Sequence, residues 1–173
     1  MEENKLITVF TPTYNRGYII GKLYKSLQEQ VAYNFEWLVI DDGSTDNTKE
    51  LVQQWMLEDN NFNIRYIKVE NGGKPRAITK ALKLAQGKYL FMVDSDDYIV
   101  NDATLKLETW IKEIDDKDDI VAVGAARVYP NGEYIKGVEP DIDDNIGYLD
   151  ATNLERKNYN LDADMCEAYK IDI

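Results

Sequence analysis

Carboxylate groups directly follow two apolar runs of the chain, and carboxylate oxygens in such a position can hold a cation. Residues 89–93 form an apolar run, and Asp94-Ser95-Asp96-Asp97 comes straight after it. Residues 36–40 end in the same way, in Asp41-Asp42-Gly43-Ser44. Aspartate is a poor strand residue and is rarely buried without a partner, so both groups should lie exposed at strand ends. Two strands that end in carboxylates predict one shared pocket.

The composition limits what this pocket can bind. The chain has no histidine, so the commonest general base and the commonest transition-metal ligand are missing. A metal site would be built from oxygen atoms, which favours magnesium, manganese or calcium. The formal net charge of −12 argues against a nucleic-acid partner, because such proteins carry a basic face.

Length and cysteine content bound the domain organisation and the compartment. With 173 residues and 44% hydrophobic content, the chain favours a single domain. One cysteine, Cys166, excludes an internal disulfide and is typical of a reducing compartment. We see no signal peptide, and no stretch approaches the roughly 20 apolar residues of a membrane span. We therefore expect no transmembrane segment here and a cytoplasmic location, which in a longer protein could be the inner face of the membrane.

Strand-like and helix-like segments alternate along the chain. The predicted strands are short apolar runs rich in β-branched and aromatic residues; they cover residues 6–10, 37–40, 64–69, 89–93 and 120–124. Apolar residues at helical spacing lie between them; the four sets are Ile20, Leu23, Leu27 and Val31; Leu51, Val52, Trp55 and Met56; Ala77, Ile78, Ala81, Leu82 and Ala85; and Leu107, Ile111 and Ile114. This alternation predicts an α/β fold, a three-layer α/β/α sandwich around a mostly parallel, Rossmann-like sheet.

Turn and cap residues mark the ends of several of these segments. Residues 44–47 predict the start of the second helix, Gly87 the stop of the third, and Asn101 or Asp102 the cap of the fourth. The dipeptide Asn131-Gly132 predicts a β-hairpin near residues 127–136.

Ligands of open parallel sheets bind at the carboxyl ends of the strands, where these loops should meet. Tyr14 offers an aromatic face for a base, and Asp42 could accept a hydrogen bond from a ring N–H. Asp94 and Asp96 offer hard oxygens for a divalent cation that would bridge a diphosphate. Two basic residues follow the turn at Asn71-Gly72-Gly73 and could approach the same phosphates; they are Lys74 and Arg76.

Four motifs, in order over roughly residues 6–125, resemble the signatures of family 2 glycosyltransferases with the GT-A fold. They are Val9-Phe-Thr-Pro-Thr-Tyr-Asn15, Val39-Ile-Asp-Asp-Gly-Ser-Thr-Asp46, Asn71-Gly-Gly-Lys74 and Gly87-Lys-Tyr-Leu-Phe-Met-Val-Asp-Ser-Asp-Asp97. The resemblance implies that Pro12, Tyr14 and Asp42 hold the nucleobase, most often uracil. Asp94 would lie near the ribose and the metal, manganese or magnesium, and Asp96 would bind that metal. Lys74 would face the phosphates; the other nucleotide-binding candidates in or beside these motifs are Asn15, Arg16, Asp41, Arg76 and Ser95.

The resemblance implies that the protein transfers a sugar from a nucleotide-diphosphate sugar, with a UDP-sugar as the expected donor, to a glycan or other hydroxyl acceptor. The reaction would depend on a metal and invert the anomeric carbon, and polysaccharide assembly is a common role of the family. The chain has Ile78-Thr79 where many members have Arg-Asn, so the phosphate contact would pass to Lys74 or Arg76.

The family's catalytic base is expected downstream of residue 173, so the catalytic residue is unknown. Three nearby acidic residues stand in no matching context; they are Asp162, Asp164 and Glu167. We therefore expect a single GT-A-type domain over residues 1–173, a piece of a longer protein. Residues 1–125 would be the nucleotide-sugar-binding half and residues 126–173 the start of the acceptor-binding half.

Two other functions stay open. A nucleotide- or metal-binding module without transferase activity would carry the same strand-end residues, and turnover with an acceptor separates it from a transferase. A nucleotidyltransferase uses a similar sheet and metal, but its glycine-rich basic loop after the first strand is missing here. Structural interpretations also exist: Asp41 and Asp42 as a turn and cap, Tyr14 as a loop aromatic, and Lys74 and Arg76 as surface charges.

Overall fold

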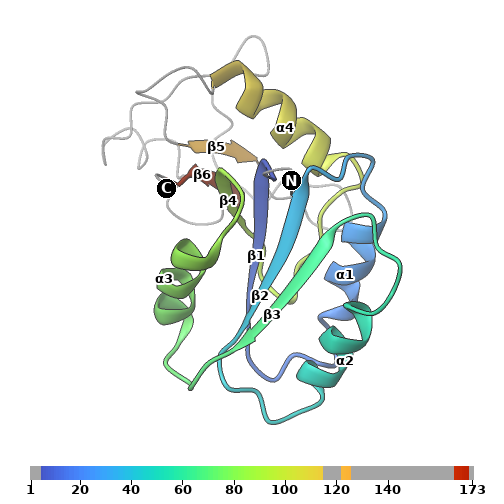
Figure 1. Cartoon of the computed structure of the whole chain (residues 1–173), viewed down its shortest axis with the longest axis vertical. Coiled ribbons are helices and arrows are strands. Elements are labelled where there is room, and N and C mark those ends of the chain that lie inside the picture. Colours follow the sequence, from blue (N-terminus) through green and yellow to red (C-terminus); the bar gives the residue numbers. More distant parts are fainter. Residues whose placement is uncertain (1–4, 115–121, 126–165, 172–173) are drawn as a thin grey trace, which may run out of the picture. The chain divides into compact units, whose positions relative to one another are not determined.

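The computed structural model describes residues 5–114, 122–125 and 166–171 (Figure 1). The chain divides into two compact units, one of residues 1–123 with 168–173 and one of residues 124–167. Of the second unit the structure describes only residues 124–125 and 166–167, which are parts of strands. The candidate site residues all belong to the first unit.

A mostly parallel sheet forms the centre of the first unit, and its strand order is β3-β2-β1-β4-β6-β5. Neighbouring strands among the first four run parallel, whereas β6 pairs antiparallel with β4. The strands are β1 (Ile7–Thr13), β2 (Phe35–Asp41), β3 (Asn63–Lys68), β4 (Tyr89–Met92), β5 (Ala122–Ala125) and β6 (Cys166–Lys170). Because β2 and β4 flank β1 on opposite sides, the strand order reverses beside β1, which is where open sheets bind ligands.

Helices cover both faces of this sheet (Figure 1). They are α1 (Gly21–Gln28), α2 (Thr48–Trp55), α3 (Lys74–Leu84) and α4 (Ala103–Ile114). On one face, Trp37 of β2 stacks with Tyr24 of α1 and Trp55 of α2, at ring-centre distances of 5.9 and 6.1 Å. The next residue, Leu38, points to the opposite face, where it packs in one cluster with Ala77 of α3. The predicted three-layer α/β/α arrangement is therefore confirmed.

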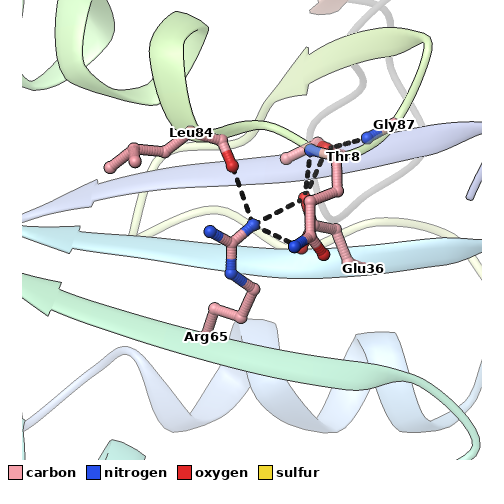
Figure 2. Close-up of polar contacts among 6 residues, drawn as sticks. Thr8, Glu36, Arg65, Leu84 and Gly87 are labelled. Atoms are coloured by element: carbon pink, nitrogen blue, oxygen red, sulfur yellow. Dashed lines mark hydrogen bonds and ion pairs between the residues drawn. The ribbon is translucent and has the colours of Figure 1, made fainter. Parts of the chain in front are cut away.

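A buried carboxylate joins three strands to the turn after α3 (Figure 2). Glu36 is fully buried, and its Oε1 accepts hydrogen bonds from Thr8 Oγ1 at 2.7 Å and from the Gln86 N–H at 2.8 Å. Arg65 Nη1 lies 2.9 Å from Glu36 Oε2 and donates to the Leu84 carbonyl at 2.8 Å. Because a buried charge is costly without such partners, this cluster fixes the end of α3 and the start of β4 on the sheet.

The same turn comes close to β1 at Gly87. A Cβ at this position would collide with the backbone of Ile7 and Thr8, and the Gly87 N–H donates to Thr8 Oγ1 at 2.9 Å. Gly87 was expected to stop the third helix, but α3 ends earlier, at Leu84. The close approach of two backbones is the reason that this position takes glycine.

The structure corrects other details of the predicted elements. Strand β1 runs to Thr13, so Pro12 lies in a strand rather than in the following loop. Val31 was placed on the face of the first helix, but α1 ends at Gln28 and Val31 is 57% exposed. The predicted helix-face residues Met56 and Leu82 are also exposed.

Several predictions fall partly or wholly outside the described residues. The hairpin near residues 127–136 lies there, as do residues 120–121 of the fifth predicted strand. Strand β6 was not predicted at all. Within residues 5–114, 122–125 and 166–171, we find no helix that is long and apolar enough to span a bilayer.

Candidate functional site

The loops that follow β1 and β2 are tied together by Asn15. Its backbone N–H donates to Ser44 Oγ at 2.8 Å, and its Oδ1 accepts from the Thr45 N–H at 2.7 Å. Asn15 has a φ of 51°, in the left-handed region that asparagine tolerates better than most residues. The side chain predicted to bind nucleotide therefore holds two loops in place, and these loops carry the neighbouring candidates.

Asp41 lies beneath the surface at the end of β2. It is fully buried, and its Oδ1 accepts from the Ser44 N–H at 2.7 Å. Its Oδ2 accepts a hydrogen bond from the Tyr66 hydroxyl. Burial and this bond raise the pKa of Tyr66 above its usual value. Both oxygens thus have protein partners. The expectation that this carboxylate lies exposed at the strand end is therefore wrong, because hydrogen bonds to Ser44 and Tyr66 satisfy it in the interior.

Asp42 connects the loop after β2 to the turn before α3. Its Oδ1 accepts from the Gly72 N–H and its Oδ2 from the Gly73 N–H, both at 2.8 Å. Asn71 Nδ2 donates to the Asp42 carbonyl at 2.9 Å. Gly73 has a φ of 84°, a conformation that side chains rarely adopt. A carboxylate has about four acceptor positions, so each oxygen of Asp42 keeps one for a further donor.

The first residue of α3 forms an ion pair with the first carboxylate after β4. Lys74 Nζ donates to Asp94 Oδ1 at 2.7 Å and to Asp94 Oδ2 at 2.9 Å. The two side chains are 46% and 37% exposed, so the pair lies where a ligand can reach it. The basic turn and the acidic strand end, which are 20 residues apart in sequence, are thus in direct contact.

Arg16 and Asp96 form a second, longer ion pair at this edge. Arg16 Nη2 lies 3.9 Å from Asp96 Oδ2, and Arg16 Nη1 donates to the Tyr18 hydroxyl at 2.7 Å. The bond to Tyr18, followed by the charge of Asp96, raises the pKa of Arg16. Asp96 is 48% exposed, so its carboxylate remains accessible.

The remaining candidates differ in accessibility. Tyr14 is 48% exposed, as a ring that stacks on a base would need to be, and Arg76 is exposed on the first turn of α3. Ser95 is buried, and Pro12 pairs with Ile40 inside the sheet. The structure therefore brings Tyr14, Asp42, Lys74 and the carboxylates after β4 to one sheet edge, as loops that follow neighbouring parallel strands.

Several residues with a role in this arrangement were not predicted. Asp46 Oδ1 accepts from the backbone and hydroxyl of Thr48, and its Oδ2 accepts from the Gly17 N–H at 3.0 Å. Burial opposes ionisation, but these hydrogen bonds outweigh it and lower the pKa of Asp46. The Ser44-Thr-Asp-Asn47 run was recognised as a cap, but its contacts with the loop after β1 were not. The Thr13 hydroxyl at the end of β1 is buried and has no hydrogen-bond partner in the described part of the chain.

Asp94 and Asp96 could bind a divalent cation whose remaining ligands come from a bound diphosphate and from water. The described residues contain no group of three or more acidic, cysteine or histidine side chains that could hold a metal alone. Magnesium is commonly bound by one or two carboxylates, with substrate phosphates and water completing its shell. Two accessible carboxylates with hard oxygens match that donor set, so the residues fit a metal that a diphosphate helps to bind.

A family model described as "Glycosyl transferase family 2" matches residues 8–169 of the chain. Glycosyltransferase GlyG of Streptococcus pneumoniae serotype 4 is 34% identical over 122 residues, which are 70% of this chain and 39% of the relative. Poly(ribitol-phosphate) beta-N-acetylglucosaminyltransferase TarS of Staphylococcus aureus is 41% identical over 105 residues, 57% of this chain and 17% of the relative. The chain thus spans less than half the length of these relatives.

Two solved structures show the same fold. The crystal structure of S. aureus TarS 1–349 in complex with UDP-GlcNAc has a TM-score of 0.58 and 35% identity, covering 62% of this chain and 31% of that chain. Mannosyltransferase PcManGT from Pyrobaculum calidifontis, in complex with GDP-Man and Mn²⁺, has a TM-score of 0.63 and 25% identity, covering 75% of this chain and 37% of that one. The expected GT-A fold is therefore confirmed.

Proposed function

Because the chain belongs to glycosyl transferase family 2, we propose that it forms the donor-binding part of an enzyme that uses a nucleotide-diphosphate sugar, with a UDP-sugar as the preferred class. The observation that carries this proposal is the contact between Lys74 and Asp94. It places a cation and an accessible carboxylate side by side at the switch point of the sheet, next to Asp96. A diphosphate with its metal needs both kinds of group within reach.

The base would be read by Tyr14 and Asp42. The accessible ring of Tyr14 can stack on a pyrimidine. Asp42 is 6% exposed and keeps an acceptor position on each oxygen, so it can accept the N3–H of uracil. Cytosine has an acceptor at N3, which a carboxylate repels. This difference favours UDP over CDP and gives the proposal a specificity that can be measured.

The chemistry would be the transfer of a sugar from the diphosphate to an acceptor hydroxyl. The acceptor oxygen forms a bond to the anomeric carbon, the bond from that carbon to the diphosphate oxygen breaks, and the configuration inverts. A general base, which the candidate residues of this chain do not include, would take the hydroxyl proton. Asp94 and Asp96 would hold a manganese or magnesium ion, which supplies positive charge to the leaving diphosphate. Lys74 would add a second positive charge, and Arg76 a further one.

The acceptor belongs to the part of the enzyme beyond the donor site. TarS is named for transfer to poly(ribitol-phosphate), and GlyG is named a glycosyltransferase. These names support a glycan or another hydroxyl-bearing polymer as acceptor, and hence a role in polysaccharide assembly. A nucleotidyltransferase is the less favoured alternative, because the loop after β1 carries Tyr14 and Asn15 in place of a glycine-rich basic sequence.

Thermal unfolding of this chain with UDP, CDP and GDP, each with and without manganese, tests the donor site. At 100 times the dissociation constant, bound UDP should add about 2.7 kcal/mol of stability and raise the midpoint by several degrees. We expect the largest shift with UDP plus manganese and a smaller one with CDP. Asp96→Ala should remove the dependence on manganese. Equal midpoints with every nucleotide would refute the proposed donor site.

A further inference from the structure

We propose that Lys74 acts as a latch on Asp94, which a divalent cation must displace before the lysine can bind the diphosphate. In the ligand-free chain the Lys74 ammonium forms an ion pair with the Asp94 carboxylate, which the cation would also bind. When the cation displaces the ammonium, Lys74 becomes available to the phosphates. The inference rests on the donor site proposed above and adds an exchange of charges within it.

The geometry of the ion pair leaves little room for a cation on Asp94. Lys74 Nζ lies 2.7 Å from one carboxylate oxygen and 2.9 Å from the other, so it stands in front of both. A metal ion bonds carboxylate oxygen at about 2.0–2.6 Å and would share this space with a positive charge. Metal and lysine therefore compete for Asp94, and each weakens the binding of the other.

The second carboxylate faces a much weaker competitor. The closest approach of Arg16 to Asp96 is 3.9 Å, and the guanidinium is also engaged by Tyr18. Asp96 is therefore the carboxylate that a cation reaches first, and Asp94 follows when Lys74 leaves. Lys74 is therefore the residue that keeps a cation from binding both carboxylates at once.

The lysine side chain can move while its backbone stays in place. The turn before it is held by Asp42, which accepts the N–H groups of Gly72 and Gly73 at 2.8 Å. Pro75 restricts the backbone on the other side of Lys74. The Lys74 side chain itself is 46% exposed on a flexible four-carbon stem, so release from Asp94 needs only rotation of its own bonds.

This arrangement makes metal binding depend on the nucleotide. Without a nucleotide, displacing Lys74 costs the ion pair, and the released ammonium gains no new anionic partner. With a diphosphate present, the displaced ammonium finds phosphate oxygens instead. Removal of the lysine should therefore have opposite effects on two measurements: metal alone should bind more tightly, whereas nucleotide with metal should bind less tightly. A residue that only stabilises the fold would not produce opposite signs.

The test compares the wild-type chain with Lys74→Met and with the control Lys106→Met. Lys106 of α4 pairs at 2.9 Å with Asp102, the residue directly before that helix. The two side chains are 54% and 41% exposed, so the control removes a similar ion pair elsewhere. Manganese binding is followed by the electron paramagnetic resonance signal of free Mn²⁺, and UDP binding at saturating manganese by calorimetry. Lys74→Met should bind manganese alone about two- to fivefold more tightly, as expected for an exposed pair. It should bind UDP roughly 10- to 150-fold less tightly, because one hydrogen bond to a charged group is lost.

Lys74→Arg provides a conservative variant. It keeps a cation beside Asp94, so its manganese affinity should stay near that of the wild type. Manganese binding that is unchanged or weaker in Lys74→Met would overturn the latch, including the case in which neither protein binds the ion. If the wild type takes up no UDP with manganese, the proposed donor site fails. The manganese measurement alone still decides whether Lys74 competes with the cation.

Discussion

Asp42→Asn is the substitution that best separates the structural role of this carboxylate from its proposed contact with the base. In the native protein its two oxygens accept the N–H groups of Gly72 and Gly73, both at 2.8 Å, and the residue is 6% exposed. Asparagine has one acceptor oxygen and one NH₂ group, so whichever way the amide is turned, one glycine N–H faces another donor. A buried donor left unsatisfied costs about 1–3 kcal/mol.

This loss is large enough to measure in the ligand-free chain. For a protein of this size, about 2 kcal/mol corresponds to a midpoint decrease of roughly 4–8 °C. The assay is thermal unfolding beside Asp59→Asn, which makes the same chemical change at an exposed position. An Asp42→Asn midpoint equal to that of the control would refute the view that this carboxylate holds the turn before α3.

The same variant tests base recognition. An asparagine side chain can donate to N3 of cytosine, which the carboxylate repels, so UDP should lose its advantage over CDP. The hydrogen bond from uracil to a charged acceptor is worth about 1.5–3 kcal/mol, so the UDP affinity should fall roughly 10- to 150-fold. Calorimetric titration of the wild type and of Asp42→Asn, at a temperature well below the unfolding midpoint of either protein, measures these affinities. If Asp42→Asn had the same ratio of UDP to CDP affinity as the wild type, the base would not be bound by Asp42.

Two further predictions concern the supports of the site. Asp46→Ala should destabilise the chain by about 0.5–2 kcal/mol at pH 7, a loss similar to that of a helix cap, because Asp46 accepts the N–H of Thr48, the first residue of α2. The pKa of Asp46 in the folded state is lowered below 3.8, so this difference should persist above about pH 4 and be lost as the pH falls through the folded pKa. Acid-unfolding curves of the two proteins measure it. Glu36→Gln should lower the free energy of unfolding by about 3–5 kcal/mol, because Arg65 then lacks its buried counter-charge. Urea unfolding measures this, and a loss of less than about 1 kcal/mol would contradict it.

The order of elements and the place of the site could be predicted from sequence, because both depend on local patterns. Alternating apolar runs and helical spacing mark β1 to β4 and the four helices of the described residues. The chain segments after β1, β2 and β4 then had to meet, because parallel strands end at the same edge. The predicted residues Tyr14, Lys74 and Asp94 do lie accessible at this edge.

The partners of the site residues could not be predicted in the same way, because they come from distant segments. Asp41 bonds Tyr66 and Asn15 bonds Ser44, at separations of 25 and 29 residues, and no spacing rule relates such positions. Aspartates after a strand look alike in sequence, whether their oxygens are buried or exposed. Strand β6 was missed for a similar reason: it is short, and it pairs with β4 from far along the chain.

These contacts mean that the ligand-free site is already satisfied by its own groups. Asp41 has two protein partners, Asp42 has two backbone donors, and Asp94 has Lys74. On the proposed function, a nucleotide sugar would therefore bind partly by exchange, in which one hydrogen bond or ion pair replaces another, and the net gain per contact would be small. Asp42 is the exception, since it can accept the base without giving up the turn. Because Lys74 directly follows that turn, one carboxylate would fix the position of a base bound at Asp42 relative to phosphates bound at Lys74.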